Sequence, residues 1–378
     1  MRIMHLSRAS IMVWQFLLPL IEEQTRRGHN VSVCGSDDAY ADTLREQGIH
    51  VVTHQLERSL NPWAIVKAIV CIKRHIRAQE IDVLVCHSPL GAGVGRLAGW
   101  WAGVPCCVYF AHGLPCVPGQ NKIKWICWLL IEKSLARMTD ALLVMNQYDE
   151  QLGRRHLMTS PQQVTRVPGM GIDLARYHGG SSQAVRQQLA QSLGVSQHAK
   201  FVLCIAYMIP AKGIYVYFQA AQKICQVRDD VVFLIAGDGP HEKALETAAF
   251  ATGLGDRFHV LGWRDDIDEL MRACDIFTLP TYYFEGLPVS ILEAMACSKP
   301  VVATQHRGCE DVVVPGETGC LVPVRKASAL ARALLKCIMD EPLCRRLGEA
   351  GRRRVEREFE LTHCTRVIAD AIEKACVR

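Results

Sequence analysis

Short apolar runs alternate with longer amphipathic runs along the first part of the chain. Apolar runs of four residues, such as Ile3 to Leu6, Val31 to Cys34 and Val83 to Cys86, are typical of buried strands. The longer runs, Phe16 to Arg27 and Ile65 to Arg77, place apolar side chains at helical spacing. Strands that alternate with helices in this way predict βαβ units and a parallel sheet.

The alternation resumes in the second half of the chain and predicts a second sheet. Its apolar runs are Phe201 to Ala206, Val231 to Ala236, Phe258 to Leu261, Ile276 to Leu279 and Val301 to Ala303. Between the two halves, the turn-rich segment Val167 to Asp173 and a polar stretch through Lys200 indicate a connection and a hinge. We therefore expect two Rossmann-like α/β domains, residues 1–166 and 167–357.

Length and charge narrow the class of protein. At 378 residues the chain is long enough for two domains with substantial cores, and its 49% hydrophobic content excludes a disordered protein. The formal net charge of +5 comes from 43 basic and 38 acidic residues. This excess is too small to indicate a nucleic-acid partner, and the sequence contains no nucleic-acid-binding motif.

The cysteines and the N-terminal segment bear on the compartment. The 17 cysteines form no regular disulfide framework and no C-x-x-C pair, which predicts buried free thiols in a reducing cytoplasm. The segment Ala9 to Ile21 is similar to the centre of a signal peptide, but Gln15 and Pro19 interrupt it and Glu22 follows where small residues are needed. No apolar run reaches the ~20 residues that span a bilayer. We expect a cytoplasmic protein.

Two acidic residues stand eight positions apart in the segment EGLPVSILEAMA. Glu285 follows the apolar run from Asp275 to Pro280, whereas Glu293 falls inside a helix that Pro288 is suited to start. The spacing therefore predicts one carboxylate in a loop and a second one on the helix that follows.

Nearly the whole chain, and this segment most clearly, resembles the retaining family 4 type glycosyltransferases of the GT-B fold that assemble bacterial surface polysaccharides. The resemblance implies two Rossmann-like domains with parallel sheets facing across a cleft, and a C-terminal helix, residues 358–378, that returns to the first domain. It implies that Glu285 approaches the donor sugar and that Glu293 binds the ribose hydroxyls, because one carboxylate can accept from both. We expect the N–H groups of Gly286 and Leu287, at the helix start, to bind a donor phosphate.

Further donor-binding positions follow two strands of the second domain. Lys212 lies where the family holds the donor diphosphate, and Gly237, Asp238 and Gly239 form a turn that lets the backbone approach a ligand. Tyr207 stands where the family has an arginine, and a phenol offers a hydrogen bond but no charge. Candidate replacement cations are Arg8, Arg264 and Arg307.

The first domain places two histidines at strand ends, where open parallel sheets bind ligands. His87 follows Val83 to Cys86, and His112 follows the strand that contains Tyr109. The resemblance favours His112 as the catalytic residue, facing the donor sugar. A purely structural role, with the ring bonded to loop backbone, stays open for both histidines.

No zinc or calcium ligand set is present in the sequence. The adjacent acidic pairs that begin at Asp37, Asp229 and Asp265 are typical of solvated turns. We expect no metal and no other cofactor, with Lys212 and helix N-termini stabilising the charge of the leaving diphosphate.

Contact with a membrane surface is indicated by lysines and tryptophans on one short apolar segment, Asn121 to Lys133. Trp100, Trp101 and the basic run Lys67 to Arg77 add to it. The alternative is an ordinary core helix.

The expected activity is transfer of a hexose or N-acetylhexosamine, with retention, from a UDP-sugar to a lipid-linked or polysaccharide acceptor. A front-face mechanism is favoured over a covalent one through Glu285. The alternatives are a nucleotide-sugar epimerase of the same fold and, because of Tyr207, a noncatalytic subunit of an assembly complex. A dehydrogenase is disfavoured because the first strand leads into Leu6 to Ser10 and not into a G-x-G-x-x-G turn.

Overall fold

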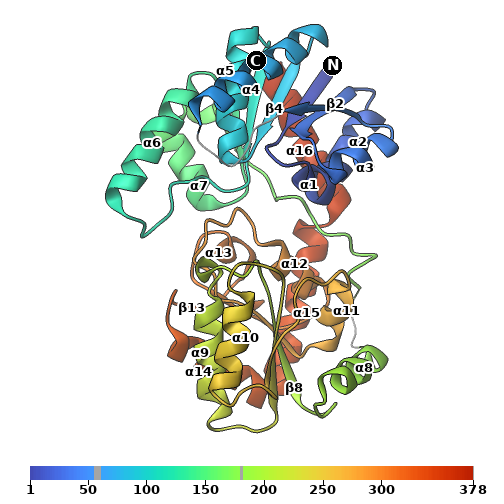
Figure 1. The fold of residues 1–378 in the computed structure, drawn as a ribbon, viewed down its shortest axis with the longest axis vertical. Coiled ribbons are helices and arrows are strands. Elements are labelled where there is room, and N and C mark those ends of the chain that lie inside the picture. Colours follow the sequence, from blue (N-terminus) through green and yellow to red (C-terminus); the bar gives the residue numbers. More distant parts are fainter. Residues whose placement is uncertain (55–60, 179–181, 378) are drawn as a thin grey trace. The chain divides into compact units, whose positions relative to one another are not determined.

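The computed structural model describes residues 1–54, 61–178 and 182–377 (Figure 1). The chain divides into two compact units, which are Met1–Gly171 with Leu361–Arg378 (unit 1) and Ile172–Glu360 (unit 2). The bounds expected from the sequence, at residues 166 and 357, fall a few residues earlier. Part of the polar stretch expected to hold the hinge, residues 179–181, lies outside the described residues.

Unit 1 contains a parallel sheet in the order β3-β2-β1-β4-β5-β6-β7. The strands are β1 Arg2–Leu6, β2 Asn30–Ser36, β3 His50–His54, β4 Val83–His87, β5 Cys106–Ala111, β6 Ala141–Val144 and β7 Val164–Arg166. The helices are α1 Ser10–Met12, α2 Leu18–Arg26, α3 Ala39–Glu46, α4 Pro62–Ala78, α5 Pro89–Ala102, α6 Lys122–Ala136, α7 Gln147–Leu152 and α16 Leu361–Cys376. The prediction of a parallel sheet is confirmed.

Glycines on α5 bring this helix close to the sheet. A Cβ atom on Gly95 would lie 2.7 Å from Sγ of Cys86, and one on Gly99 would lie 2.9 Å from Cδ2 of Leu84. Both neighbours belong to β4, which is buried at every position. The helix therefore packs directly on the central strands, and β4 is covered on both faces, as parallel strands require.

The helix predicted from Phe16 to Arg27 begins earlier than expected. A π-helical turn, Val13–Leu17, joins α1 to α2 and makes the path helical from Ser10 onward. Val13 and Leu17 are fully buried. Side chains four positions apart share a helix face, so the burial of this pair extends the helix beyond the amphipathic run.

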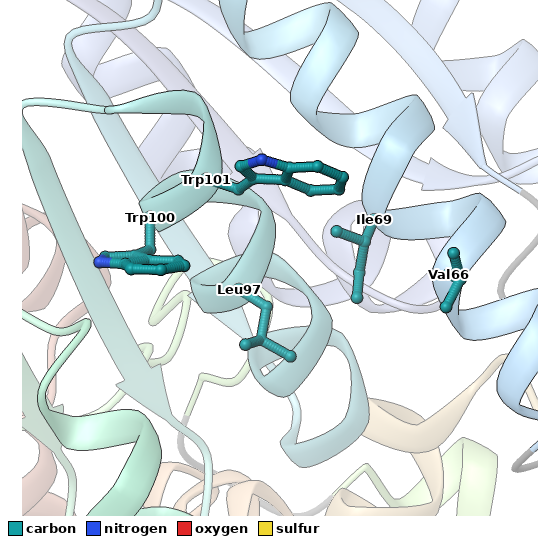
Figure 2. A pocket seen from close by; sticks show the side chains of 5 residues that line it. All are labelled: Val66, Ile69, Leu97, Trp100 and Trp101. Atoms are coloured by element: carbon teal, nitrogen blue, oxygen red, sulfur yellow. The ribbon is translucent and has the colours of Figure 1, made fainter.

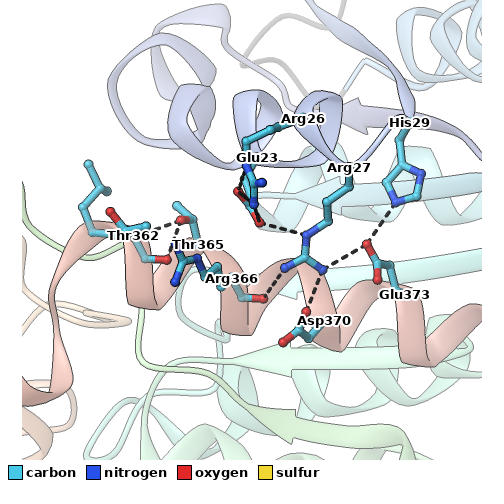
Figure 3. Close-up of polar contacts among 10 residues, drawn as sticks. Glu23, Arg26, Arg27, His29, Thr362, Thr365, Arg366, Asp370 and Glu373 are labelled. Carbon is cyan, nitrogen blue, oxygen red and sulfur yellow. Dashed lines mark hydrogen bonds and ion pairs between the residues drawn. The ribbon is translucent and has the colours of Figure 1, made fainter.

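The C-terminal helix α16 packs within unit 1, where Figure 1 shows it in red among the blue elements. Its buried face includes Ile368 and Ile372. On its polar face, the guanidinium of Arg27, the residue that follows α2, contacts Oδ1 of Asp370 at 2.6 Å and Oε1 of Glu373 at 3.1 Å (Figure 3). Arg27 also donates from Nε to Glu23, at 2.9 Å. The apolar face of α16, and the contacts of Arg27 with acidic residues of both helices, thus hold α16 against α2.

Unit 2 contains a second parallel sheet, in the order β10-β9-β8-β11-β12-β13. The strands are β8 Lys200–Ile205, β9 Val231–Ala236, β10 Phe258–Val260, β11 Ile276–Leu279, β12 Val301–Thr304 and β13 Gly319–Val322. The helices are α8 Gln183–Leu193, α9 Ile214–Cys225, α10 Glu242–Ala251, α11 Ile267–Ala273, α12 Val289–Ala296, α13 Cys309–Val312, α14 Ala327–Met339 and α15 Glu341–Glu358. The predicted α/β class with two parallel sheets is therefore confirmed.

Candidate functional site

In unit 2, Lys212 and Glu285 form an ion pair at the carboxyl ends of two neighbouring strands. Lys212 ends the short turn after β8, and Glu285 lies in the loop after β11. Nζ of Lys212 lies 2.7 Å from Oε1 of Glu285, and the side chains are only 18% and 10% exposed. The hydroxyl of Thr281 donates to the same carboxylate oxygen at 2.9 Å. The structure thus brings together two of the predicted catalytic residues, and Oε1 of Glu285 has both Lys212 and Thr281 as partners.

The loops around this pair pack against each other through backbone atoms. Gly213 has φ +79°, and a Cβ there would lie 2.0 Å from the carbonyl oxygen of Pro280. Gly237 has φ +130°, and a Cβ there would lie 2.2 Å from the carbonyl oxygen of Ala206. Any other residue would push the loops after β8, β9 and β11 apart. The glycines therefore set the distance at which Lys212 meets Glu285.

Three other predicted donor-binding residues, Tyr207, Asp238 and Gly239, lie in the loops after β8 and β9. Gly239, with φ +148°, has no room for a Cβ, which would lie 2.7 Å from the amide nitrogen of Met208. The same amide donates to the carbonyl oxygen of Asp238 at 2.6 Å, while the side chain of Asp238 is exposed. Tyr207 is 46% exposed.

Helix α12 begins after Pro288, as the sequence predicts, and places Glu293 near its middle. Oε1 of Glu293 accepts a hydrogen bond from the hydroxyl of Tyr177 at 2.7 Å. Burial raises the pKa of Glu293, and the Tyr177 hydrogen bond opposes this rise. Gly286 and Leu287 lie just before the helix, and Leu287 is buried. The two acids of the motif therefore have separate partners.

Sequence reasoning missed Tyr177. It lies 116 positions before Glu293, and no local pattern relates the two residues. Two cations named as replacements for the absent arginine belong to unit 2. Arg264 pairs with Asp266, and Arg307 is 2% exposed.

In unit 1, three histidines form a row with Gln24 of α2. Oε1 of Gln24 lies 2.7 Å from Nε2 of His5. Nδ1 of His5 lies 3.0 Å from Nε2 of His87, and Nδ1 of His87 lies 3.0 Å from Nε2 of His112. Burial lowers the pKa of His5 and of His112 to about 4 each, and it also lowers the pKa of His87 well below its usual range. All three imidazoles are therefore neutral near pH 7.

The sequence identified His112 and His87 but missed His5 and Gln24. The sequence signal for His5 was its position as a polar residue inside the apolar run Ile3 to Leu6. That run was interpreted only as a strand. Gln24 gave no signal because its bond to His5 joins a helix to a strand. The structure thus assigns His112 and His87 to unit 1, and Lys212, Glu285 and Glu293 to unit 2. Their roles toward a ligand stay predictions.

Two protein-family models match separate parts of the chain. The model described as Glycosyl transferase 4-like domain matches residues 13–169, and the model described as Glycosyl transferases group 1 matches residues 185–354. The two matches lie within units 1 and 2.

Named relatives match along most of their length. The chain is 26% identical over 349 residues to the N,N'-diacetylbacillosaminyl-diphospho-undecaprenol alpha-1,3-N-acetylgalactosaminyltransferase of Campylobacter jejuni, covering 91% of each chain. It is 24% identical to the UDP-Gal:alpha-D-GlcNAc-diphosphoundecaprenol alpha-1,3-galactosyltransferase of Escherichia coli, over 82% of this chain and 80% of that one.

Among solved structures, the chain is similar to Anabaena HepE in complex with UDP. The TM-score is 0.82 at 23% identity, and the match covers 99% of this chain and 100% of HepE. The two chains share one fold.

The neutral histidines predict a pH-dependent stability of unit 1. The unfolded chain takes up protons at these residues below about pH 6.5, whereas the folded chain resists protonation to about pH 4, so stability is full above pH 6.5 and falls as the pH drops toward 4. We expect the loss of stability to be on the order of 1 kcal/mol per pH unit for each imidazole whose pKa is lowered. Urea unfolding followed by tryptophan fluorescence measures it, because six of the seven tryptophans belong to unit 1.

His5→Gln should flatten this pH slope, whereas His156→Gln, at an exposed position, should leave it unchanged. Equal slopes in the two variants would contradict the prediction.

Proposed function

We propose that this chain, a glycosyltransferase of the GT-B fold, transfers a hexose or N-acetylhexosamine from a UDP-sugar. Its N-terminal part matches the glycosyl transferase 4-like domain and its C-terminal part matches the group 1 glycosyl transferases. The proposed acceptor is lipid-linked or a polysaccharide, and the anomeric configuration is retained. The observation that carries the proposal is the Lys212–Glu285 pair, held at 2.7 Å at the carboxyl edge of the unit 2 sheet. In open α/β sheets this edge is where ligands bind.

The named relatives support this choice of donor and acceptor. The Escherichia coli relative is named for UDP-Gal, and both relatives are named for substrates linked to diphospho-undecaprenol. HepE binds UDP. These relatives are transferases, which favours transfer over epimerisation as the reaction of this chain.

In the proposed mechanism, the bond between the anomeric carbon and the diphosphate breaks, and its electron pair leaves with UDP. Lys212 stabilises the departing charge together with the helix N-terminus at Gly286 and Leu287. An acceptor hydroxyl attacks from the same face and gives its proton to the leaving phosphate, so no protein nucleophile is needed. Glu285 orients the sugar, and His112 is proposed to bind a sugar hydroxyl. No step needs a metal.

Glu293 is proposed to hold the ribose. A carboxylate offers about four acceptor sites, and the Tyr177 hydroxyl uses one of them. The free sites suit a pair of vicinal hydroxyls. Tyr177 therefore orients Glu293 without blocking it.

We expect Glu293→Ala to weaken UDP binding about 10- to 100-fold, since hydrogen bonds to a charged group contribute about 1.5–3 kcal/mol. Glu285→Ala should leave UDP binding nearly unchanged, because UDP lacks the sugar, and should mainly lower kcat. Calorimetry with UDP and transfer assays with UDP-sugars separate the two effects. Glu317→Ala, the same change at an exposed loop position, serves as the control. UDP binding by Glu293→Ala as tight as that of the unmodified protein would disprove the ribose assignment.

Transfer should survive EDTA, because Lys212 and the helix start supply the positive charge in the proposed mechanism. The assay compares initial rates in EDTA, in buffer and in added Mg²⁺. Activity that is lost in EDTA and restored by Mg²⁺ or Mn²⁺ would show that a metal stabilises the diphosphate.

We also propose that unit 1 contacts an anionic membrane surface through α4, α5 and α6, which we call the basic apolar face. Its exposed large apolar side chains are Trp63, Val66, Trp100, Trp101, Ile123, Ile126, Leu130 and Ile131. Lysines and arginines stand between them, at Lys67, Lys73, Arg74, Arg77, Lys122, Lys124 and Lys133. The alternative expected from the sequence, an ordinary core helix at Asn121 to Lys133, holds for one face of α6, where Trp125, Trp128 and Leu129 pack against the core of unit 1. The other face exposes four of the helix's eight large apolar side chains.

The charge of this face has one sign. The single acidic residue in the three helices is Glu132, which is 2% exposed and pairs with Arg96 at 2.8 Å. All exposed charges of α4, α5 and α6 are therefore positive, which suits anionic headgroups. Within the described part of the chain, no helix is long and apolar enough to cross a bilayer.

Between α4 and α5, the face contains an apolar hollow of about 220 Å³ (Figure 2). Val66, Ile69 and Leu97 line it together with the two adjacent tryptophans of α5. Nζ of Lys73 lies 3.7 Å from the centre of the Trp101 ring. Indole rings beside ammonium groups are typical of the headgroup region, because one part of each side chain is apolar and the other is polar.

The protein should sediment with phosphatidylglycerol vesicles and much less with phosphatidylcholine vesicles. Lys122→Glu with Lys124→Glu should weaken binding at least about tenfold, because each basic residue near an anionic surface contributes about 1 kcal/mol. Lys223→Glu with Lys243→Glu, exposed lysines of unit 2, makes the same change in net charge and should have little effect. Equal binding by the two double variants would refute the basic apolar face as the contact.

A further inference from the structure

The histidine row of unit 1 runs across neighbouring strands toward His112. His5 belongs to β1, His87 ends β4 and His112 directly follows β5, and these strands are adjacent in the sheet. The register pairs His5 with Val85 and His87 with Phe110. His5 and His87 are fully buried, whereas His112 is half-buried. The row thus leads from the interior to a partly open imidazole.

The hydrogen bonds of the row have one direction. The amide oxygen of Gln24 can only accept, so Nε2 of His5 carries the proton and Nδ1 of His5 is bare. The bare nitrogen requires a proton on Nε2 of His87, which leaves Nδ1 of His87 bare. By the same rule Nε2 of His112 carries a proton. The orientation of the Gln24 amide therefore determines, ring by ring, which nitrogen of each histidine carries the proton.

The row also requires neutral rings. A protonated imidazole donates from both nitrogens, so charging His87 would direct one of its N–H groups at the N–H of a neighbour. Burial lowers the pKa of all three rings and keeps them uncharged. A neutral His112 with Nε2 protonated presents Nδ1 as a hydrogen-bond acceptor.

We propose that Gln24, His5 and His87 are positioning residues that fix the tautomer of His112, so that its Nδ1 accepts a hydrogen bond from a substrate hydroxyl. This inference rests on the proposed function only for the identity of the substrate. A bare imidazole nitrogen favours a hydroxyl, which can donate, over a carboxylate, which can only accept. The row therefore suits a neutral hexose or N-acetylhexosamine better than a uronic acid.

Gln24 is a suitable residue for the test. Its Nε2 is buried and has no hydrogen-bond partner among the residues that the structure describes. Gln24→Met conserves the volume of the side chain, removes the acceptor that orients His5 and removes the unpaired donor as well. The fold should therefore tolerate the change, while the tautomers of the three histidines are no longer fixed.

The experiment is nitrogen-15 NMR of the full-length protein labelled at histidine, which distinguishes protonated from bare ring nitrogens. In the unmodified protein we expect protonated Nε2 and bare Nδ1 at His5, His87 and His112. In Gln24→Met we expect His112 to become a mixture of tautomers, and kcat/KM for the UDP-sugar to fall about fivefold, the loss of roughly one hydrogen bond. Gln151→Met, at an exposed position, should change neither.

A protonated Nδ1 at His112 in the unmodified protein would overturn the inference. An unchanged His112 tautomer in Gln24→Met would also overturn it. The proposed function is tested separately by His112→Ala. If that variant transfers sugar at the normal rate, the catalytic role of His112 is disproved, whereas the NMR result still decides whether the row sets the tautomer.

Discussion

Parallel pairing of strands is the constraint on which both candidate sites depend. Every described ladder in either sheet is parallel, so the carboxyl ends of neighbouring strands meet at one edge. In unit 2, the neighbours β9, β8 and β11 are followed by Gly237, Lys212 and Glu285. In unit 1, the histidine row lies at or next to the carboxyl ends of β1, β4 and β5. Residues far apart in the chain become neighbours because the strands before them are neighbours.

Within unit 2, backbone contacts between loops set the finer geometry. Gly213 against Pro280, and Gly237 against Ala206, leave no room for a side chain. These contacts carry the strand order into the loops, where Lys212 meets Glu285 at 2.7 Å. A glycine in such a turn therefore shapes the site even if its own backbone never touches the donor.

The two units use burial in opposite ways. Around Glu285, a lysine and a threonine satisfy a charged carboxylate, so the buried charge is paired. Around His87, the neighbours are other imidazoles that give no opposite charge, so the buried rings stay neutral. Charge stabilisation is thus available in unit 2, and directed neutral hydrogen bonding in unit 1.

The sequence by itself determined the α/β class, most strands and the candidate residues of the E-x7-E segment, because strand and helix periodicities and a proline before a helix are local signals. The edge strands β3, β7 and β13 are short or partly polar and gave weaker signals, whereas β6, Ala141–Val144, is an apolar run of four residues that was overlooked. Only the tertiary structure decided that Lys212 pairs with Glu285, that Tyr177 binds Glu293 and that His5 and Gln24 stand behind His112. Each of these contacts joins residues from different elements, and their distance depends on strand order and loop packing, which no local pattern records.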